Sequence, residues 1–239
     1  MELSVKNLSK QYENLLVLDD LSHTFEQSKI TVVLGPSGCG KTTLLNILCG
    51  LETGYSGFLS GFPESKISYI FQNNRLLPWI SVLDNVALPL KTVFSSRQQR
   101  KDHAASILKQ VQLDQFMHYK PSALSEGMQK RAALARAFAN PGSVLLLDEA
   151  FSALDIKTKL LIMDLFLEIQ SMEKRTAIVV THDVKEAIYI GDYLTVLSQK
   201  PSRIIESLPN PLPNGDARAY QSKVAAELES HIYQTLISK

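Results

Sequence analysis

The sequence is poor in cysteine, has no long apolar run and carries no excess of either charge. Its 239 residues contain two cysteines, and 25 lysines and arginines against 24 aspartates and glutamates leave a formal net charge of +1. Two cysteines exclude a disulfide framework, and the balanced charge disfavours non-specific nucleic-acid binding. The longest apolar runs, such as residues 144–147 and 177–180, fall far short of the roughly 18 to 20 residues that cross a bilayer.

We expect no secretory signal, because residues 1–6 have no positively charged start followed by an apolar stretch. We therefore expect the protein to stay in the cytoplasm. With 45% hydrophobic and 21% charged residues, the composition is that of a globular protein, which excludes disorder as the main state.

Short apolar runs alternate with helical patterns along the chain. Strands are predicted at residues 30–34, 143–147, 176–180 and 193–197, with helices between several of them, which indicates an α/β fold with a largely parallel sheet. The interval at about residues 73–140 differs: apolar residues recur at helical spacing, and an alanine-rich stretch follows Ser125 and ends before Pro141. We expect a mostly helical lobe there, inserted between core segments 1–72 and 141–206.

The C-terminal part, residues 207–239, is predicted to be a proline-rich linker followed by a helix. Residues 208–215 contain three prolines, which cannot continue a helix or a central strand. Every fourth residue beyond them is apolar: Tyr220, Val224, Leu228, Ile232 and Leu236. We favour packing of this stripe within the chain over a regulatory contact between two copies.

A glycine-rich loop follows the predicted strand 30–34 and precedes a predicted helix at residues 42–49. It fits the pattern G-x-x-x-x-G-K-[ST], in which backbone N–H groups surround phosphate oxygens at a helix N-terminus. Lys41 would hold the β- and γ-phosphates of a nucleotide, and the hydroxyl of Thr42 would ligate Mg²⁺. The alternative is a strand-to-helix turn with a solvated lysine. The residues predicted to bind ATP here are Gly35, Pro36, Ser37, Gly38, Cys39, Gly40, Lys41, Thr42 and Thr43.

Two further features bear on this site: a cysteine inside the loop, and two acidic residues after a later strand. Because Cys39 lies inside the loop, we expect an alkylating reagent to inhibit the protein and ATP to protect it.

The apolar strand at 143–147 is followed by Asp148 and Glu149. A carboxylate in that place fixes the metal ion of phosphoryl-transfer sites, directly or through water, which is the role predicted for Asp148. Glu149 is placed to polarise an attacking water, although the spacing alone does not divide the two roles.

Residues 124–131 read Leu-Ser-Glu-Gly-Met-Gln-Lys-Arg, upstream of the Asp-Glu strand. With the phosphate loop, this motif resembles the ABC ATPases, the nucleotide-binding subunits of ATP-binding-cassette transporters, over the chain up to about residue 206. The resemblance implies a P-loop NTPase (RecA-like) core with an ABC-type antiparallel β part and an inserted α-helical subdomain, together residues 1–206. It also implies a head-to-tail homodimer, in which Ser125 and Gly127 of one copy contact the ATP held by the other.

Two residues depart from the family pattern, since Glu126 replaces the first glycine of a Gly-Gly pair and Lys130 replaces a common glutamine. A carboxylate close to a γ-phosphate would repel it. At the first turn of a helix, however, glutamate is favourable. Our hypothesis is that Glu126 faces away from ATP and is compatible with activity.

Individual residues outside these two motifs also resemble functional residues of the family. Tyr12 lies where an aromatic ring stacks on adenine, although a lone tyrosine is more often a packing residue. Gln72 resembles the glutamine that contacts Mg²⁺ and water, and His182 the histidine that contacts the γ-phosphate. Asp155 lies in a loop that resembles the one linking the two subunits, and it also fits the N-cap of a helix that ends at Gln170.

Residues 75–90, which include Trp79, resemble the nitrate, sulfonate and taurine importer group, whose relatives also import thiamine precursors. This implies a peripheral subunit on the cytoplasmic side of the membrane, bound to a separate permease and served indirectly by a solute-binding protein, with no nucleic-acid partner. Trp79 would line the groove for the permease or be a buried core residue. The alternative function is a soluble ABC ATPase of nucleic-acid repair or translation, whereas a GTPase is disfavoured because no Asn-Lys-x-Asp motif occurs.

Overall fold

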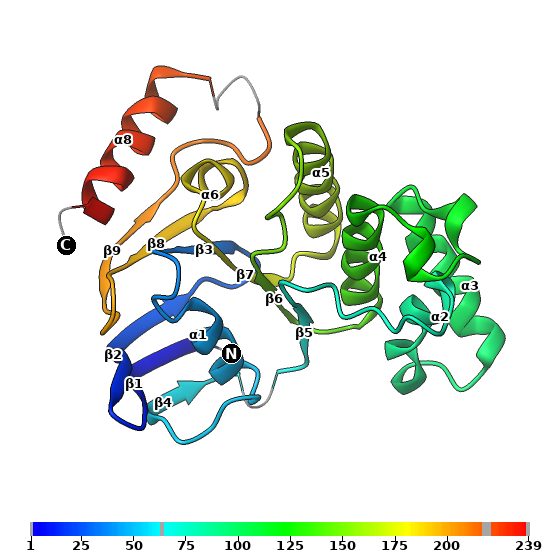
Figure 1. The fold of residues 1–239 in the computed structure, drawn as a ribbon, viewed down its shortest axis with the longest axis horizontal. Helices are drawn as coiled ribbons and strands as arrows, with labels where there is room; N and C mark the ends of the chain where they lie inside the picture. The colour runs from blue at the N-terminus through cyan, green and yellow to red at the C-terminus, as the bar shows by residue number, and fades with distance from the viewer. Residues whose placement is uncertain (1, 63–64, 217–220, 238–239) are drawn as a thin grey trace.

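The computed structural model describes residues 2–62, 65–216 and 221–237, which form two β-sheets with helices packed against them (Figure 1). The larger sheet has six strands in the order β5-β6-β7-β3-β8-β9, and its neighbouring strands are parallel except for the pair β8 and β9. The strands are β3 Ile30–Leu34, β5 Ile67–Ile70, β6 Val144–Asp148, β7 Thr176–Thr181, β8 Tyr193–Leu197 and β9 Ile204–Pro209. The four strands predicted from apolar runs are all confirmed, each to within one residue at either end.

The register of the central strands determines what meets at the edge of the larger sheet. Leu34 of β3 pairs with Thr181 of β7, and Asp148 of β6 pairs with Val180 of β7. The carboxyl ends of these parallel strands are therefore level, and the segments that follow them leave the sheet at the same edge. Those segments begin with the phosphate loop, Glu149 and His182.

The smaller sheet is antiparallel, as the family resemblance implies, with three strands in the order β2-β1-β4. The strands are β1 Leu3–Tyr12, β2 Leu15–Phe25 and β4 Ser56–Ser60. A buried apolar cluster joins this sheet to helix α1, Lys41–Leu48, and to one face of the larger sheet. Tyr12 lies at the turn where β1 passes into β2, where it pairs with Leu15.

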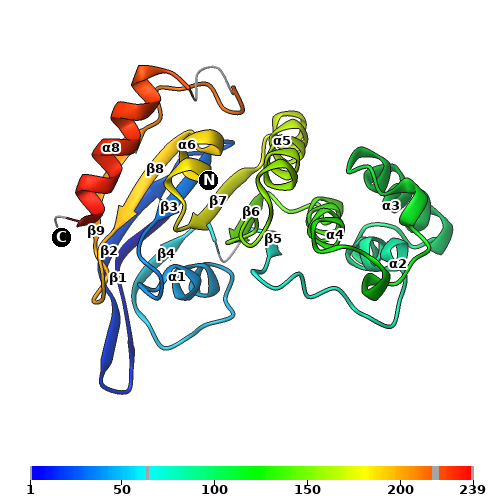
Figure 2. The ribbon, with the colours of Figure 1, turned by 45° about the horizontal axis from the view of Figure 1, so that its top comes forward.

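The interval predicted to be mostly helical contains three packed α-helices. They are α2 Val82–Ala87, α3 Arg97–Gln110 and α4 Glu126–Ala139, with the short 3₁₀ turns η1 Pro89–Thr92, η2 Asp114–Phe116 and η3 Pro121–Ala123. The three α-helices contact one another, and α4 also contacts β5 and helix α5, Ile156–Glu173. Helices α2 and α3 extend away from the two sheets beyond α4 (Figures 1 and 2).

Short polar side chains begin several helices. Ser125, Asp155 and Asp183 each accept a hydrogen bond from a backbone N–H of the first turn, at α4, α5 and α6 (Val184–Ile190) respectively. These bonds satisfy donors that the helix itself leaves unpaired. The predicted N-cap at Asp155 is therefore confirmed, but α5 continues past Gln170 to Glu173.

The C-terminal segment differs from the prediction at its start. Leu208 and Pro209, predicted to begin a linker, instead end strand β9 and pair with Leu194 and Tyr193 of β8. Strand β9 is an edge strand, and a proline is tolerated on an edge because half of the backbone groups there lie outside the ladder.

Helix α8, Lys223–Ile237, contacts α6 and β8. Leu228 and Ile232 of the predicted stripe are buried, Val224 is exposed, and Tyr220 lies outside the described residues. Packing within the chain is thus confirmed for the middle of the stripe. Across the described residues, no helix has the length and apolarity that a membrane span requires.

Candidate active site

The phosphate loop joins β3 to α1 through glycines in conformations that other residues rarely adopt. Gly38 has a φ of 77° and Gly40 a φ of 114°. A Cβ atom on Gly40 would lie 2.8 Å from the side chains of Val17 and Leu18, so packing as well as conformation requires glycine there. The loop is consequently pressed against β2, with its backbone curled over the start of α1.

The N-terminus of α1 has no side-chain cap and no acidic residue in its first turn. Its first N–H groups therefore lack partners within the helix and can bind an anion. The ammonium of Lys41 folds back over the loop and donates hydrogen bonds to the carbonyl oxygens of Gly35 and Pro36 at 2.8 and 2.9 Å. A lysine held in this place fits the phosphates of a nucleotide, because its donors can exchange carbonyl for phosphate oxygens.

Cys39 contributes its backbone to the loop, whereas its thiol faces the core. The residue is 2% exposed and belongs to the apolar cluster between the two sheets. Its Sγ lies against Gly35, where a Cβ atom would approach it to 2.8 Å. This burial argues against attack by an alkylating reagent, because the sulfur lies among apolar residues of the sheets and of α1. Inhibition by alkylation and protection by ATP stay predictions.

Asp148 and Thr42 present oxygen atoms side by side. The Thr42 hydroxyl donates to Asp148 Oδ1 at 3.1 Å, and Asp148 is 3% exposed at the end of β6. Burial raises the pKa of Asp148 and the Glu149 carboxylate raises it further, whereas the Thr42 hydroxyl and the Lys41 ammonium act in the opposite direction. A hydroxyl and one carboxylate beside a phosphate loop fit Mg²⁺, which takes oxygen ligands and few protein groups.

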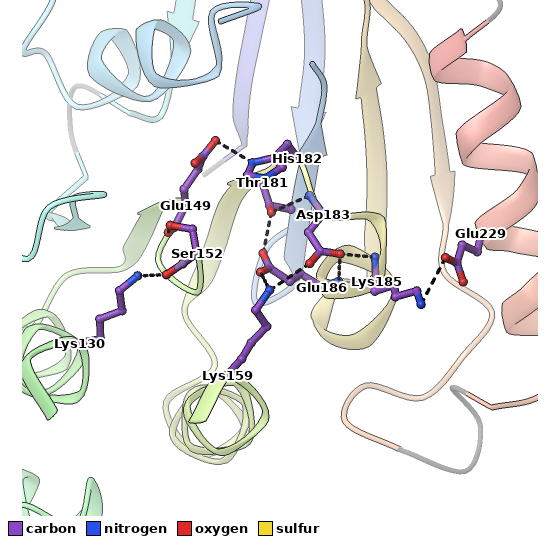
Figure 3. A network of polar contacts seen from close by, with 10 residues as sticks. All are labelled: Lys130, Glu149, Ser152, Lys159, Thr181, His182, Asp183, Lys185, Glu186 and Glu229. Carbon is purple, nitrogen blue, oxygen red and sulfur yellow. Dashed lines mark hydrogen bonds and ion pairs between the residues drawn. The ribbon is translucent and has the colours of Figure 1, made fainter. Parts of the chain in front are cut away.

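Glu149 lies between the two other residues predicted to act in hydrolysis. Gln72 Nε2 donates to Glu149 Oε2 at 3.1 Å. On the other side, His182 Nδ1 lies 3.2 Å from Glu149 Oε1, as Figure 3 shows. These residues follow β5, β6 and β7, three neighbouring strands, so the sheet brings them together. A carboxylate held by an amide and an imidazole, one residue from Asp148, can orient and deprotonate a water.

The backbone at Glu149 is strained. Its φ is 44°, and Ala153, four residues later, has a φ of 58°. Left-handed backbone costs roughly 1 to 2 kcal/mol for each residue other than glycine. The turn between them is tied by Ser152, whose N–H and hydroxyl both donate to the Glu149 carbonyl, at 3.1 and 2.8 Å.

His182 is held through its neighbours on both sides. The Thr181 hydroxyl donates to the buried Glu186 at 2.6 Å, and the ammonium of Lys159 on α5 lies 2.6 Å from Glu186 and 3.0 Å from Asp183 (Figure 3). Two carboxylates that share one lysine lock the strand end and the cap of α6 together. Sequence reasoning missed Lys159 and Glu186, because only the contact between α5 and α6 gives them a common task.

Tyr12 lies on the other side of the phosphate loop, at the end of β1. Lys10 Nζ is 4.6 Å from the centre of its ring, and the same ammonium lies 2.8 Å from Glu52 Oε1. Burial, helped by a hydrogen bond to Glu52, raises the pKa of the Tyr12 hydroxyl. The Tyr12 side chain, which is 40% exposed, is thus held by Lys10 over its ring and by Glu52 at its hydroxyl. A flat group such as adenine can stack on an aromatic ring held in this way.

Ser125 and Gly127 lie at the start of α4, and no hydrogen bond or ion pair of the described residues joins them to the phosphate loop. The Ser125 Oγ accepts from the Met128 N–H at 3.3 Å, which leaves its own proton available to an acceptor. Gly127 is buried, and a Cβ atom there would lie 2.6 Å from the Thr158 side chain of α5. Close packing of α4 on α5 therefore accounts for this glycine within one chain.

Trp79 is 68% exposed, so the alternative of a buried core residue is wrong. It lies at a groove of α2 and α3 that Ile80 and Leu88 also line. Leu77 and Ala87 add to the apolar lining, and the charged lining residues are Lys91, Arg97, Arg100, Lys101 and Asp84. The groove therefore combines apolar residues with an excess of basic over acidic side chains, and Lys101 lies 3.4 Å from Asp84.

Comparisons with known proteins agree with this geometry. A family model described as ABC transporter matches residues 18–152. The chain is 37% identical over 235 residues to an aliphatic sulfonates import ATP-binding protein SsuB of Bacillus cereus, covering 96% of this chain and 92% of that protein. The fold of the present chain resembles that of MJ0796, described as a dimeric bacterial ABC transporter cassette. The TM-score is 0.77 at 30% identity, and 87% of this chain and 98% of that chain are covered.

A second structure of MJ0796, a dimeric post-hydrolysis state bound to ADP and Pi, has a TM-score of 0.76 at the same 30% identity, and 87% of this chain and 98% of that chain are covered. The family match spans the phosphate loop, Gln72, the motif at Ser125 and the Asp148–Glu149 pair. The similarity to the sulfonate import subunit extends over 96% of this chain at 37% identity, which shows membership of the same family. The chain therefore belongs to the ABC transporter family and is one of its ATP-hydrolysing subunits.

Proposed function

We propose that the chain is the ATPase subunit of an importer for a small solute of the sulfonate type. The observation that carries the proposal is the Glu149 carboxylate, which is held between Gln72 and His182 and follows Asp148, itself hydrogen-bonded to Thr42. Hydrolysis needs a base beside the phosphates, and this is the carboxylate so placed. The sulfonate import subunit to which the chain is similar supports the importer class.

Each residue of the site has one task in this proposal. Lys41 and the open N-terminus of α1 bind the phosphates, and Tyr12 stacks on adenine. Thr42, Asp148 and Gln72 would hold Mg²⁺, which would neutralise phosphate charge.

Hydrolysis falls to the residues around the carboxylate. Glu149 takes a proton from the attacking water. His182 orients that carboxylate and contacts the γ-phosphate.

The complete site needs two copies of the chain. Ser125 and Gly127 lie apart from the phosphate loop of their own chain, and the hydroxyl proton and α4 N-terminus of a partner copy would meet the γ-phosphate instead. The dimeric cassettes to which the fold is similar support this arrangement. A single copy therefore hydrolyses ATP poorly, and closure of the homodimer brings each site to completion.

The groove at Trp79 is the proposed attachment site of the permease. An exposed tryptophan beside apolar and mostly basic lining residues favours a short amphipathic helix that carries acidic residues. The chain would then act as a peripheral subunit at the cytoplasmic face of the membrane. A solute-binding protein would deliver the cargo to the permease, and the ATPase itself would never touch it.

Replacing Glu149 with glutamine tests the proposal. The amide keeps the size of the side chain and cannot take a proton, so turnover should fall roughly a hundredfold or more. ATP binding should persist, and an ATP-bound dimer should accumulate in size-exclusion chromatography. The matched control is Glu168→Gln, an exposed glutamate of α5. Unchanged turnover in Glu149→Gln would remove this carboxylate from catalysis.

Uptake measurements test the solute class. The chain is co-produced with its permease and binding protein in vesicles, and labelled alkanesulfonate is supplied with nitrate, taurine or a pyrimidine as competitor. ATP-dependent uptake of the sulfonate that Glu149→Gln abolishes supports the proposal. Uptake of only another solute would retain the importer and overturn the sulfonate assignment.

A further inference from the structure

Lys130 of α4 is a lysine in a buried place with a contact that the mechanism above does not use. It is 6% exposed, and its ammonium donates a hydrogen bond to the carbonyl oxygen of Ser152 (Figure 3). Burial lowers the pKa of Lys130, while the carboxylates of Glu126, Glu186 and Glu149 act against that shift and the ammonium of Lys159 adds to it. Burying an ammonium is costly unless it is paired, so the contact with Ser152 is a constraint that the fold maintains.

Ser152 connects this contact to the catalytic carboxylate. Its N–H and its hydroxyl both donate to the carbonyl oxygen of Glu149, which closes the turn 149–152. The turn lies between two non-glycine residues with positive φ, Glu149 and Ala153, a conformation that needs restraint from its surroundings. Lys130 supplies that restraint from outside the turn, because its bond goes to the one peptide oxygen that links Ser152 to Ala153.

Gln72, whose amide donates to the Glu149 carboxylate, also lies near Lys130. A pocket between α4 and the segment after β5 is lined by Gln72, Glu126, Gln129 and Lys130. Lys130 therefore lies where the helix that begins at Ser125 meets both the turn of Glu149 and the segment of Gln72.

We propose that Lys130 is a positioning residue for hydrolysis: by holding the Ser152 carbonyl, it fixes Glu149 in line with Gln72 and His182. The inference rests on the catalytic role proposed for Glu149. In this proposal Lys130 acts through the turn alone, by its bond to the Ser152 carbonyl. Because α4 begins with the residues that face the partner's ATP, the same bond makes the alignment of Glu149 depend on where α4 sits.

The test replaces Lys130 with methionine in the full-length chain, which keeps the length of the side chain and removes its donor. Initial rates over a range of Mg·ATP concentrations give kcat and KM separately. Misplacing a catalytic group by about 1 Å costs up to roughly a hundredfold, so kcat should fall about 10- to 100-fold while KM stays within about twofold. Lys130→Arg, which retains a donor, should recover most of the loss.

Two controls separate positioning from folding. Lys109→Met removes an exposed lysine of α3 and should leave kcat and KM unchanged. Thermal melting of Lys130→Met reports its stability; should this variant fail to fold, Lys130→Gln, which keeps a shorter donor, should fold with an intermediate kcat. Normal kcat in Lys130→Met, or a loss that Lys130→Arg does not restore, would overturn the proposal, as would a rise in KM that matches a loss of stability.

The double variant Lys130→Met/Glu149→Gln distinguishes the two proposals. If Lys130 acts through Glu149, the double variant hydrolyses ATP no more slowly than Glu149→Gln alone. A further, multiplicative loss would mean that Lys130 acts by another route and would overturn the inference. Full turnover in Glu149→Gln would instead refute the catalytic role of Glu149, and an inactive Glu149→Gln beside a fully active Lys130→Met would refute the positioning role alone.

Discussion

Two helix N-termini of this molecule are proposed to meet the same phosphate, and they are built in opposite ways. At α1 the N-cap is Gly40, which offers no side-chain cap, and the first turn has no acidic residue. At α4 the Ser125 hydroxyl oxygen accepts from the first turn, and Glu126 occupies the first helical position. One end is left open for an anion, and the other is closed by its own residues.

The difference shows which end bears the charge of the ligand. A side-chain cap is worth about 1 kcal/mol to a helix, and α1 gives that up where a bound anion can take its place. Ser125 keeps the cap and retains one free hydroxyl proton for a second anion contact. We therefore expect the N-terminus of α1 to provide most of the affinity for the phosphates of ATP. The N-terminus of α4 would contact the partner's ATP only when the dimer closes.

The largest effect should follow from Lys41→Met, which removes the charge at the open end. Losing a buried cationic partner of phosphate costs about 2 to 5 kcal/mol, so ATP affinity should fall by roughly a hundredfold. Isothermal titration with Mg·ATP measures the loss, and Lys6→Met, an exposed lysine of β1, is the control. Affinity within about threefold of the parent would mean that the α1 end does not bind the phosphates through Lys41.

The second effect concerns Ser125, whose two tasks can be separated. Ser125→Ala removes cap and proton, so turnover should fall and stability should drop by about 1 kcal/mol. For a chain of this length that lowers the melting temperature by about 2 to 4 °C. Ser125→Asn restores the cap without the hydroxyl, and Ser125→Thr restores both. Full turnover in Ser125→Asn would show that the hydroxyl serves only the helix, and the contrast between the two ends would disappear.

Local chemistry explains how much of this contrast could be predicted from the sequence. The glycines and Lys41 define a loop conformation within a few residues, and serine or aspartate before a helix defines a cap. The strands that support the site read as apolar runs because they are buried on both faces. These features need no knowledge of distant parts of the chain, which is why the phosphate loop, the central strands and the N-caps are found where the sequence places them.

What could not be predicted depends on register and on packing between distant segments. The contacts of Glu149 with Gln72 and His182 need the order β5-β6-β7, which no local pattern specifies. Lys130 and Ser152 are 22 residues apart in sequence and meet because α4 packs against β5 and α5, and Ser152 lies in the turn that precedes α5. The inward thiol of Cys39 has the same cause, since the side-chain direction inside a loop is set by the sheet beneath it.

The smallest effect, and the sharpest test of the contrast, is expected from Glu126→Gly, which restores the family's glycine at the closed end. Glu126 is exposed and favours the N-terminus of α4 by about 0.3 to 1 kcal/mol through the helix dipole. Its removal should lower stability by about that amount or slightly more, because glycine is a poor helix former. ATP turnover should change by no more than about threefold, and Glu126→Gln separates the charge from the side chain. A rise in turnover by an order of magnitude in both variants would mean that the carboxylate repels the partner's ATP. The α4 end would then need an open, uncharged N-terminus as α1 does, and the two ends would differ in sequence but not in task.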